Sequence, residues 1–149
     1  MGFPLNERLT EGLGLVGVVA PVSATTAVLT AAIDITKARK VLATCHCGVL
    51  GTSATVTFKA QGATTSGGSY TDISGASMTF VKATDDGKSG QLEVTANGVQ
   101  ALGLGYKFIK FSVGADVASL FAVSVYAAGG PEEPMSGQNL ASLKTTTVI

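Results

Sequence analysis

Apolar and polar residues alternate along the central part of the chain. In the stretch ATVTFKAQ, Ala54, Val56, Phe58 and Ala60 occupy every second position, with Thr, Lys or Gln between them. Successive side chains of a β-strand point to opposite faces of a sheet. The pattern therefore predicts a strand with one buried face and one face in water.

Three further segments predict strands. Residues 91–94, QLEV, alternate in the same way, with Leu92 and Val94 inward, while residues 106–113 and 120–127 are rich in β-branched and aromatic residues. Segments rich in Gly, Ser, Asn or Asp predict turns, and these are residues 64–69, 84–90, 96–98 and 113–116. The spacing predicts an all-β fold, either an antiparallel β-sandwich or a small jelly-roll-like barrel with extended arms at both ends.

The chain divides into three expected regions: an N-terminal arm of residues 1–21, a β-sandwich domain of residues 22–128 and a C-terminal arm of residues 129–149. Glycines recur in the first region, and the last region contains the PEEP sequence at 131–134 near its start. Proline continues neither a β-ladder nor a helix interior, so the C-terminal arm is expected to leave the domain.

The C-terminal arm becomes apolar again beyond the prolines, with Leu140, Leu143, Val148 and Ile149 available to dock. We expect this arm to add a strand to a neighbour or to enter a groove of a partner. The alternative is that it folds back on its own sheet.

A long uncharged run extends from Gly12 to Ile33 and has about the length that crosses a bilayer. Pro21 and several Ser and Thr residues interrupt it, which is unfavourable for a membrane-spanning helix. We therefore expect an apolar arm or a first strand of a chain made in the cytoplasm, and no membrane partner. A secreted or membrane-linked β-domain is the alternative, and it would need this run as a targeting segment.

Charge is sparse and balanced. The 149 residues include ten Lys plus Arg and ten Asp plus Glu, and 13% of the chain is charged. A chain of this length fits one domain, and its balanced charge offers no field to neutralise phosphates, so nucleic acid is not an expected partner.

The sequence TCHCG at 44–48 holds the two cysteines and the single histidine of the chain. If residues 41–47 form a strand, Cys45 and Cys47 face the core and His46 points the other way. Structural zinc needs about four ligands, and neighbouring same-face thiols of a strand are too far apart to bridge comfortably. We therefore expect core thiols and no metal site.

Catalysis is not expected either. One histidine leaves no base with an orienting partner for a hydroxyl nucleophile, and no nucleophile-elbow or phosphate-loop motif follows a strand. The pair Asp85 and Asp86, followed by Gly87, predicts a solvated turn rather than a calcium loop. The chain is thus not expected to be an enzyme or to hold a cofactor.

Two segments of the chain resemble a known pattern of strands and turns. They are residues 55–80, TVTFKAQGATTSGGSYTDISGASMTF, and residues 105–113, GYKFIKFSV. This succession of strands and turns resembles the small head decoration, or cement, proteins of tailed bacteriophages, which are minor capsid proteins encoded beside the major capsid protein. Lys107 and Lys110 stand where that pattern has arginines, and the C-terminal arm is not part of it.

The resemblance implies a β-rich structural protein that binds the outside of an assembled capsid and stabilises it. Its expected partners are the major capsid protein and further copies of itself, with a trimer as the expected form, and its expected location is the capsid surface of the virion. The expected contact residues lie in the two arms and are Leu13, Leu15, Leu140, Leu143, Val148 and Ile149. The alternative function is a carbohydrate or host-surface binding module of a phage tail or fibre, with Tyr70 and Asp72 at its site.

Overall fold

The computed structural model describes residues 8–130, 139–141, 143 and 144. The strands are β1 (Leu13–Ala24), β2 (Val28–Leu29), β3 (Ile33–Asp34), β4 (Lys40–Cys47), β5 (Thr55–Ala63), β6 (Thr71–Val81), β7 (Ser89–Thr95), β8 (Phe108–Ala115) and β9 (Ser119–Ala128). The helical elements are short and comprise α1 (Leu9–Gly12), a 3-10 turn η1 (Ile35–Lys37), α2 (Lys82–Asp85) and α3 (Ala96–Gln100). The described chain is therefore almost entirely β, as predicted.

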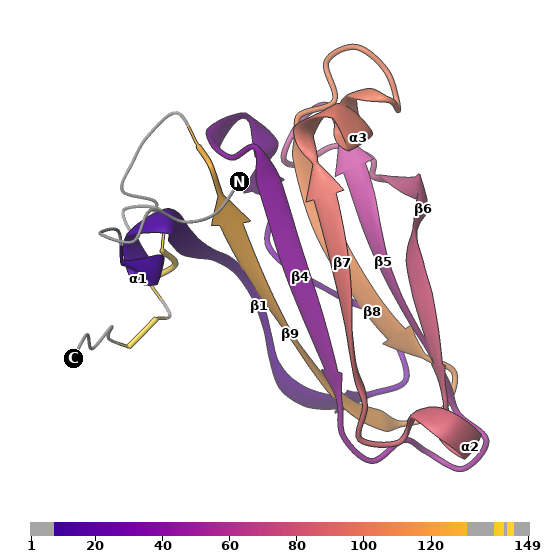
Figure 1. Ribbon diagram of the computed structural model, residues 1–149. Coiled ribbons are helices and arrows are strands. Elements are labelled where there is room, and N and C mark those ends of the chain that lie inside the picture. The colour runs from indigo at the N-terminus through magenta and orange to yellow at the C-terminus, as the bar shows by residue number, and fades with distance from the viewer. Residues whose placement is uncertain (1–7, 131–138, 142, 145–149) are drawn as a thin grey trace.

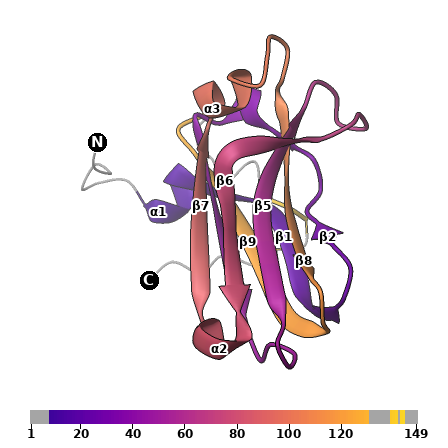
Figure 2. The same ribbon diagram turned by 90° about the vertical axis from the view of Figure 1, so that its right-hand side faces the viewer.

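The strands form two sheets. One has the order β1-β9-β4-β7, and the other has the order β2-β8-β5-β6 with β3 also paired to β8. Figure 1 shows the first sheet from β1 to β7, and Figure 2 shows β6, β5, β8 and β2 side by side. We call them the first and the second sheet.

The pairing is nested and antiparallel throughout. The hairpin β5–β6 lies at the centre, β4–β7 surrounds it, β2 and β3 with β8 come next, and β1–β9 is outermost. The pairs β4–β9 and β5–β8 then join these ribbons into two sheets. A long antiparallel ribbon wound in this way is a jelly roll, which confirms the predicted fold class.

The predicted alternation describes the core well. Val56 and Phe58 are fully buried, and Phe58 packs against Phe111 of β8 with 5.9 Å between the ring centroids. Leu92 and Val94 of β7 face the same interior from the first sheet. Both sheets thus have a closed inner face, and what distinguishes them lies outside.

The N-terminal boundary differs from the prediction. β1 starts at Leu13, inside the expected arm of residues 1–21, and it pairs with β9 from Leu13↔Ala128 to Ala24↔Ser119. Glycine in this segment does not indicate a loose arm. A Cβ at Gly17 would lie 3.0 Å from a methyl carbon of Val125, beside a shift in the β1–β9 register, so the glycine permits a close approach at a bulge.

Some turn predictions are corrected as well. β8 continues through Ala115, so that residues 113–115 of the expected turn belong to a strand in which Val113 is fully buried. Gly114 lies in that strand because the backbone of Ala27 passes close to it, with 3.1 Å from the glycine's hypothetical Cβ to the Ala27 Cα. The expected turn at 84–90 runs from the end of α2 to the start of β7, and residues 96–98 lie within α3, whereas residues 64–69 belong to the loop between β5 and β6.

The run from Gly12 to Ile33 forms β1, β2 and the beginning of β3 rather than a helix. Among the residues that the structure describes, no helix has the length and apolar character needed to cross a bilayer.

Candidate interaction surface

The outer face of the first sheet carries apolar side chains in register. Leu15 of β1 lies opposite Tyr126 of β9, and Tyr126 lies opposite Leu42 of β4. Val18 and Leu13 occupy the neighbouring outer positions of β1, opposite Ser124 and Ala128. Residues paired across antiparallel strands share a face of the sheet. We call Leu13, Leu15, Val18, Leu42 and Tyr126 the apolar outer patch.

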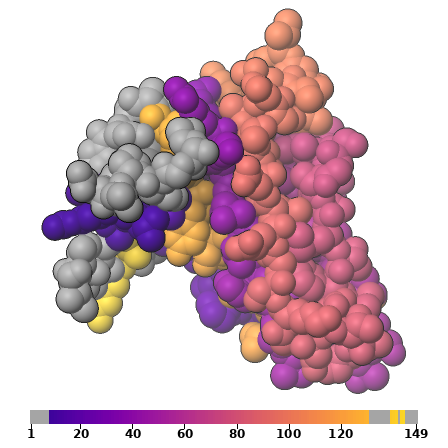
Figure 3. Space-filling view, in the orientation of Figure 1, coloured from indigo at the N-terminus to yellow at the C-terminus, as the bar shows by residue number. Residues whose placement is uncertain are grey.

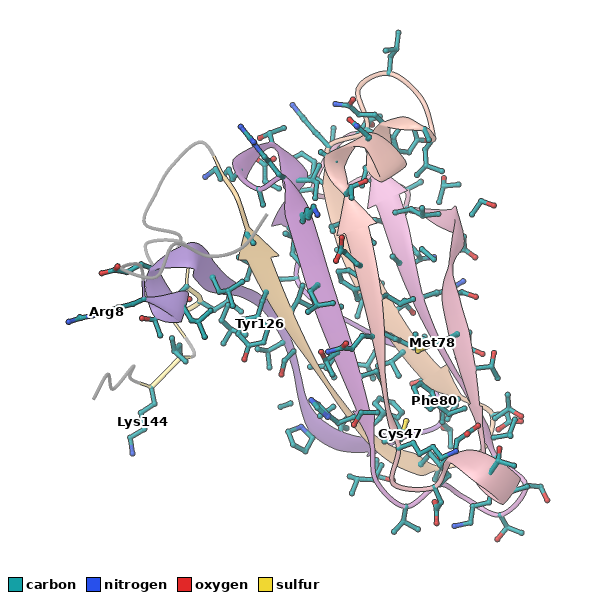
Figure 4. All side chains as sticks on the ribbon, viewed as in Figure 1. Arg8, Cys47, Met78, Phe80, Tyr126 and Lys144 are labelled. Carbon is teal, nitrogen blue, oxygen red and sulfur yellow. The ribbon has the colours of Figure 1, made fainter. Side chains whose placement is uncertain are left out.

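The patch is accessible. Val18 is 36% exposed and Tyr126 is 39% exposed, while Leu13, Leu15 and Leu42 are half-buried. Figure 4 shows Tyr126 beside β9 on the side where β1 and α1 lie. Neither β1 nor β9 contains a single charged residue. The charges of this face lie at its β7 side, where Glu93 is opposite Leu42 and pairs with Lys40 at 3.8 Å. An accessible group of apolar side chains with polar residues at its margin is typical of a surface that another protein covers.

The outer face of the second sheet is polar at its centre, with the apolar residues Leu29 and Val81 exposed at its two margins. Lys59 Nζ lies 2.8 Å from Asp72 Oδ2, and Gln61 Nε2 donates to Asp72 Oδ1 at 2.6 Å. These hydrogen bonds from Lys59 and Gln61 lower the pKa of Asp72. The carboxylate is therefore held in its ionised form by its own neighbours.

The expected carbohydrate residues lie on this polar side. Lys110 Nζ is 4.5 Å from the centroid of the Tyr70 ring, and the Tyr70 hydroxyl donates to the carbonyl oxygen of Ser66 at 2.9 Å. Asp72 is bound to Lys59 and Gln61 as described above. Both residues thus stabilise the second sheet and its loop, and one face of the Tyr70 ring is covered.

The C-terminal segment meets the patch at its edge. The backbone N–H of Leu15 donates to Oδ1 of Asn139 at 2.6 Å, and the N–H of Leu140 donates to the carbonyl oxygen of Leu15 at 2.8 Å. Leu140 and Leu143 are both half-buried. Figure 3 shows the described C-terminal residues, in yellow, against the indigo N-terminal segment.

Four of the predicted contact residues are therefore brought together at one edge: Leu13, Leu15, Leu140 and Leu143. Val148 and Ile149 lie outside the described residues. For Asn139 and Leu140 the structure corrects the expectation that the C-terminal arm leaves the domain, because these residues return to the chain's own β1. The physical reason is that an edge strand presents unpaired N–H and C=O groups, which a nearby segment can satisfy.

Sequence analysis did not find Leu42, Val18 or Tyr126 as surface residues. Their convergence depends on the pairing of β4 and β1 with β9, which joins residues far apart in the sequence. The sequence contains one indication of this apolar face, because residues 119–128 alternate in burial and have no charged residue at the outer positions.

The thiols of TCHCG lie in the core, as predicted. Cys45 is fully buried and Cys47 is 6% exposed, whereas His46 is exposed and its Nδ1 lies 2.9 Å from Oγ of Ser89. A hydrogen bond with Cys47 and burial raise the pKa of the Cys45 thiol. Within the described ranges, no three His, Cys, Asp or Glu residues are grouped so that they could hold a metal ion.

Backbone N–H groups donate to both carboxylates of the acidic turn, Asp85 and Asp86. The N–H of Leu50 donates to Asp86 at 2.7 Å and the N–H of Val81 donates to Asp85 at 2.9 Å. Asp86 also pairs with Lys82, and Asp85 with Lys88. These hydrogen bonds lower the pKa of both carboxyl groups, which connect the loops at the α2 end of the sandwich.

Comparison with known proteins places the chain in no family. The sequence matches no family model and no curated protein. Among solved structures, a chain of the disulfide-linked pili of Bacillus endospore appendages is 13% identical over 86% of this chain and 96% of that one, with a TM-score of 0.43. A chain of the cowpea mosaic virus empty virus-like particle is 12% identical over 91% and 94%, with a TM-score of 0.41.

A xylan-binding CBM22-2 domain from Paenibacillus barcinonensis Xyn10C is also similar, with 12% identity over 82% of this chain and 89% of that one and a TM-score of 0.37. The neighbours named here thus come from a virus particle, a pilus and a carbohydrate-binding domain. Since all three TM-scores are low, the assignment as a jelly-roll sandwich rests on the strand order of this chain. The surface described above that a partner protein could cover is the apolar outer patch.

Proposed function

We propose that this protein is a structural subunit of a phage-like particle, which binds the outside of the assembled capsid and stabilises it by protein–protein contacts. The observation that carries the proposal is the apolar outer patch on a sheet face whose β1 and β9 strands have no charges. The resemblance of residues 55–80 and 105–113 to head decoration proteins supports the same function. The proposal assigns no catalytic step, cofactor or metal.

The patch has the chemistry of a contact surface. Full burial of a Leu, Val or aromatic side chain contributes about 1.5–3 kcal/mol. Tyrosine is also enriched among the residues that dominate binding energy, and Tyr126 lies in the middle row of the patch between Leu15 and Leu42. Contact with a major capsid protein, or with further copies of this chain in a trimer, would remove these side chains from water.

A co-sedimentation assay tests the proposal. Capsid shells that lack this protein are mixed with the wild-type chain, with a Leu42→Ser/Tyr126→Ser variant, and with a Thr57→Ser/Thr79→Ser control on the outer face of the second sheet. We expect the wild-type and control proteins to sediment with the shells and the patch variant to remain in solution. Equal sedimentation of the patch variant, or no binding of any of them, contradicts the proposal.

The carbohydrate-binding alternative finds less support in the side-chain contacts. Lys110 lies over the ring of Tyr70, and both carboxylate oxygens of Asp72 have partners in the chain. Sugar binding relies on accessible aromatic faces, and the chain has no Trp and three Tyr. We therefore propose no second function.

A further inference from the structure

β1 is an edge strand, and most of its free edge is irregular. It lies at the end of the first sheet, with β9 on one side only. Its register against β9 shifts between Leu15 and Gly17 and again between Val19 and Val22, and Pro21 lies within the second shift. Bulges and proline prevent an edge from pairing with another strand. The regular part of the edge is therefore the short segment Leu13–Leu15.

That regular segment is where the C-terminal residues bind. Leu15 uses both of its backbone groups, accepting from the N–H of Leu140 and donating to the side-chain oxygen of Asn139. The contact requires no particular side chain at Leu15. It requires an available edge and a segment that carries Asn139 and Leu140, and every copy of the chain has both.

The connection to this segment is long. Asn139 follows Gly129 by ten positions, and an extended stretch of that length reaches at most about 33–36 Å. A neighbouring molecule whose β1 lies within this distance can receive the segment without any change in the sandwich. Among the described residues, two hydrogen bonds join the segment to β1, and the same two can form on the β1 of another copy.

We propose that Asn139 and Leu140 of one copy exchange onto the β1 edge of a second copy when the molecules are held close together. The proposal rests on the proposed function, since a particle surface is what brings copies together, and it names the second copy as the partner of this edge. Exchange conserves the Leu15 contacts and makes them join two subunits, because the segment stays covalently attached to its own chain while it binds the edge of the second copy. A mutual swap of this kind would link neighbours beside their apolar outer patches.

Concentration decides whether the C-terminal segment binds β1 of its own chain or β1 of a neighbouring copy. A tethered segment has an effective concentration on the order of millimolar for its own edge. The free protein in dilute solution therefore keeps the closed arrangement of the structure. Exchange becomes favourable when a neighbour's edge is present at a comparable local concentration, as on a crowded shell.

Chemical cross-linking distinguishes binding within one chain from exchange between two copies. Leu15→Cys retains the backbone groups that make the contact, and Ala141→Cys lies beside Leu140 at an exposed position. A short bis-maleimide is added to a chain with both substitutions, and to a mixture of two chains that carry one substitution each. Wild-type protein is the background control, because Cys45 and Cys47 are 0% and 6% exposed. Val49→Cys, at a position that is 71% exposed in the loop after β4, replaces Ala141→Cys in the control mixture.

We expect the double variant to form an intramolecular link in dilute solution. The mixture should form intermolecular links at millimolar concentration, and on capsid shells, at least tenfold above the Val49→Cys control. Intermolecular linking at the control level under both conditions overturns the exchange, and so does the absence of the intramolecular link. If wild-type protein binds shells but the variants form no intermolecular links in concentrated solution or on shells, the exchange fails and the proposed function stands. If the variants exchange in concentrated solution and wild-type protein does not bind shells, the proposed function fails and the exchange stands.

Discussion

The two outer faces of the sandwich differ in how their side chains are paired. On the second sheet, Lys59, Gln61 and Asp72 form a hydrogen-bonded group, and Lys110 lies over Tyr70. On the first sheet, the outer residues of β1 and β9 have no charges, and Tyr126 remains 39% exposed. The polar residues at the centre of the second sheet are satisfied within the chain, and its exposed apolar residues Leu29 and Val81 lie apart at its margins. The first sheet instead groups apolar side chains that another molecule can cover.

The C-terminal segment also binds on the side of the apolar face. The segment around Asn139 and Leu140 binds β1, at the margin of the apolar outer patch and not on the polar side. Contact through the first sheet would therefore involve the patch and the C-terminal segment together. A change on the second sheet's outer face should leave association intact, and this asymmetry can be tested directly.

The largest effect should come from beneath the polar face. Phe58→Ala should lower the free energy of unfolding by about 3–5 kcal/mol, because the rigid strands cannot refill the cavity against Phe111. Lys59→Ala, the adjacent outward residue of β5, should cost about 0–1 kcal/mol, as expected for an exposed ion pair. Urea unfolding measures both. Equal, small effects at both positions would show that the register or the strand containing Phe58 is assigned wrongly.

Adding one charge to each outer face tests the comparison itself. Ser124 lies between Val18 and Thr44 in the first sheet, and Thr79 lies opposite Thr57 in the second. Ser124→Lys should weaken self-association by about a hundredfold, or about 2.8 kcal/mol, because an unpaired ammonium would be buried in the contact. Thr79→Lys adds the same charge and should change association little. Sedimentation velocity over a range of concentrations gives both values, and comparable losses would mean that the two faces are equivalent.

Local alternation made the core predictable from the sequence. The inward positions of residues 54–61 and of Cys45 and Cys47 follow from a period of two, and they are buried. β1 was partly mistaken for an arm because its glycines suggest flexibility, while their function in the fold is close approach at a bulge. That distinction depends on Val125, more than a hundred residues away.

The patch and the C-terminal contact depend on pairing that local patterns do not contain. Leu15, Leu42 and Tyr126 become neighbours only when β9 inserts between β1 and β4. The prolines after Gly130 correctly mark the end of the sandwich strand, but they do not exclude a return of the chain further on. Leu15 receives Leu140 because an edge strand has open peptide groups there.

Removing residues 131–149 should affect association more than stability. The deletion removes the two hydrogen bonds to Leu15, and since each contributes about 0.5–1.5 kcal/mol, their loss should lower the free energy of unfolding by about 1–3 kcal/mol. Self-association or capsid attachment should weaken at least tenfold. A shorter deletion of residues 145–149 separates Val148 and Ile149 from Leu140 and Leu143. Loss of the folded state in calorimetry would mean that the segment belongs to the core, and unchanged attachment would leave the patch as the sole contact.

The smallest effect concerns acid stability of the polar face. Hydrogen bonds from Lys59 and Gln61 lower the pKa of Asp72 in the folded protein, so this carboxylate contributes stability above its unfolded pKa of about 3.9. The contribution is lost as the pH falls through the folded pKa, because protonation removes the charge that Lys59 and Gln61 bind. Asp72→Asn should therefore be slightly less stable than wild type at pH 7, and the difference should disappear once the pH is below the folded pKa of Asp72. Thermal unfolding of both proteins between pH 2 and pH 7 measures this, with self-association at pH 7 as the control. A difference that persists at the lowest pH would show that Asp72 acts through its shape, and a loss of association would place the polar face in the contact after all.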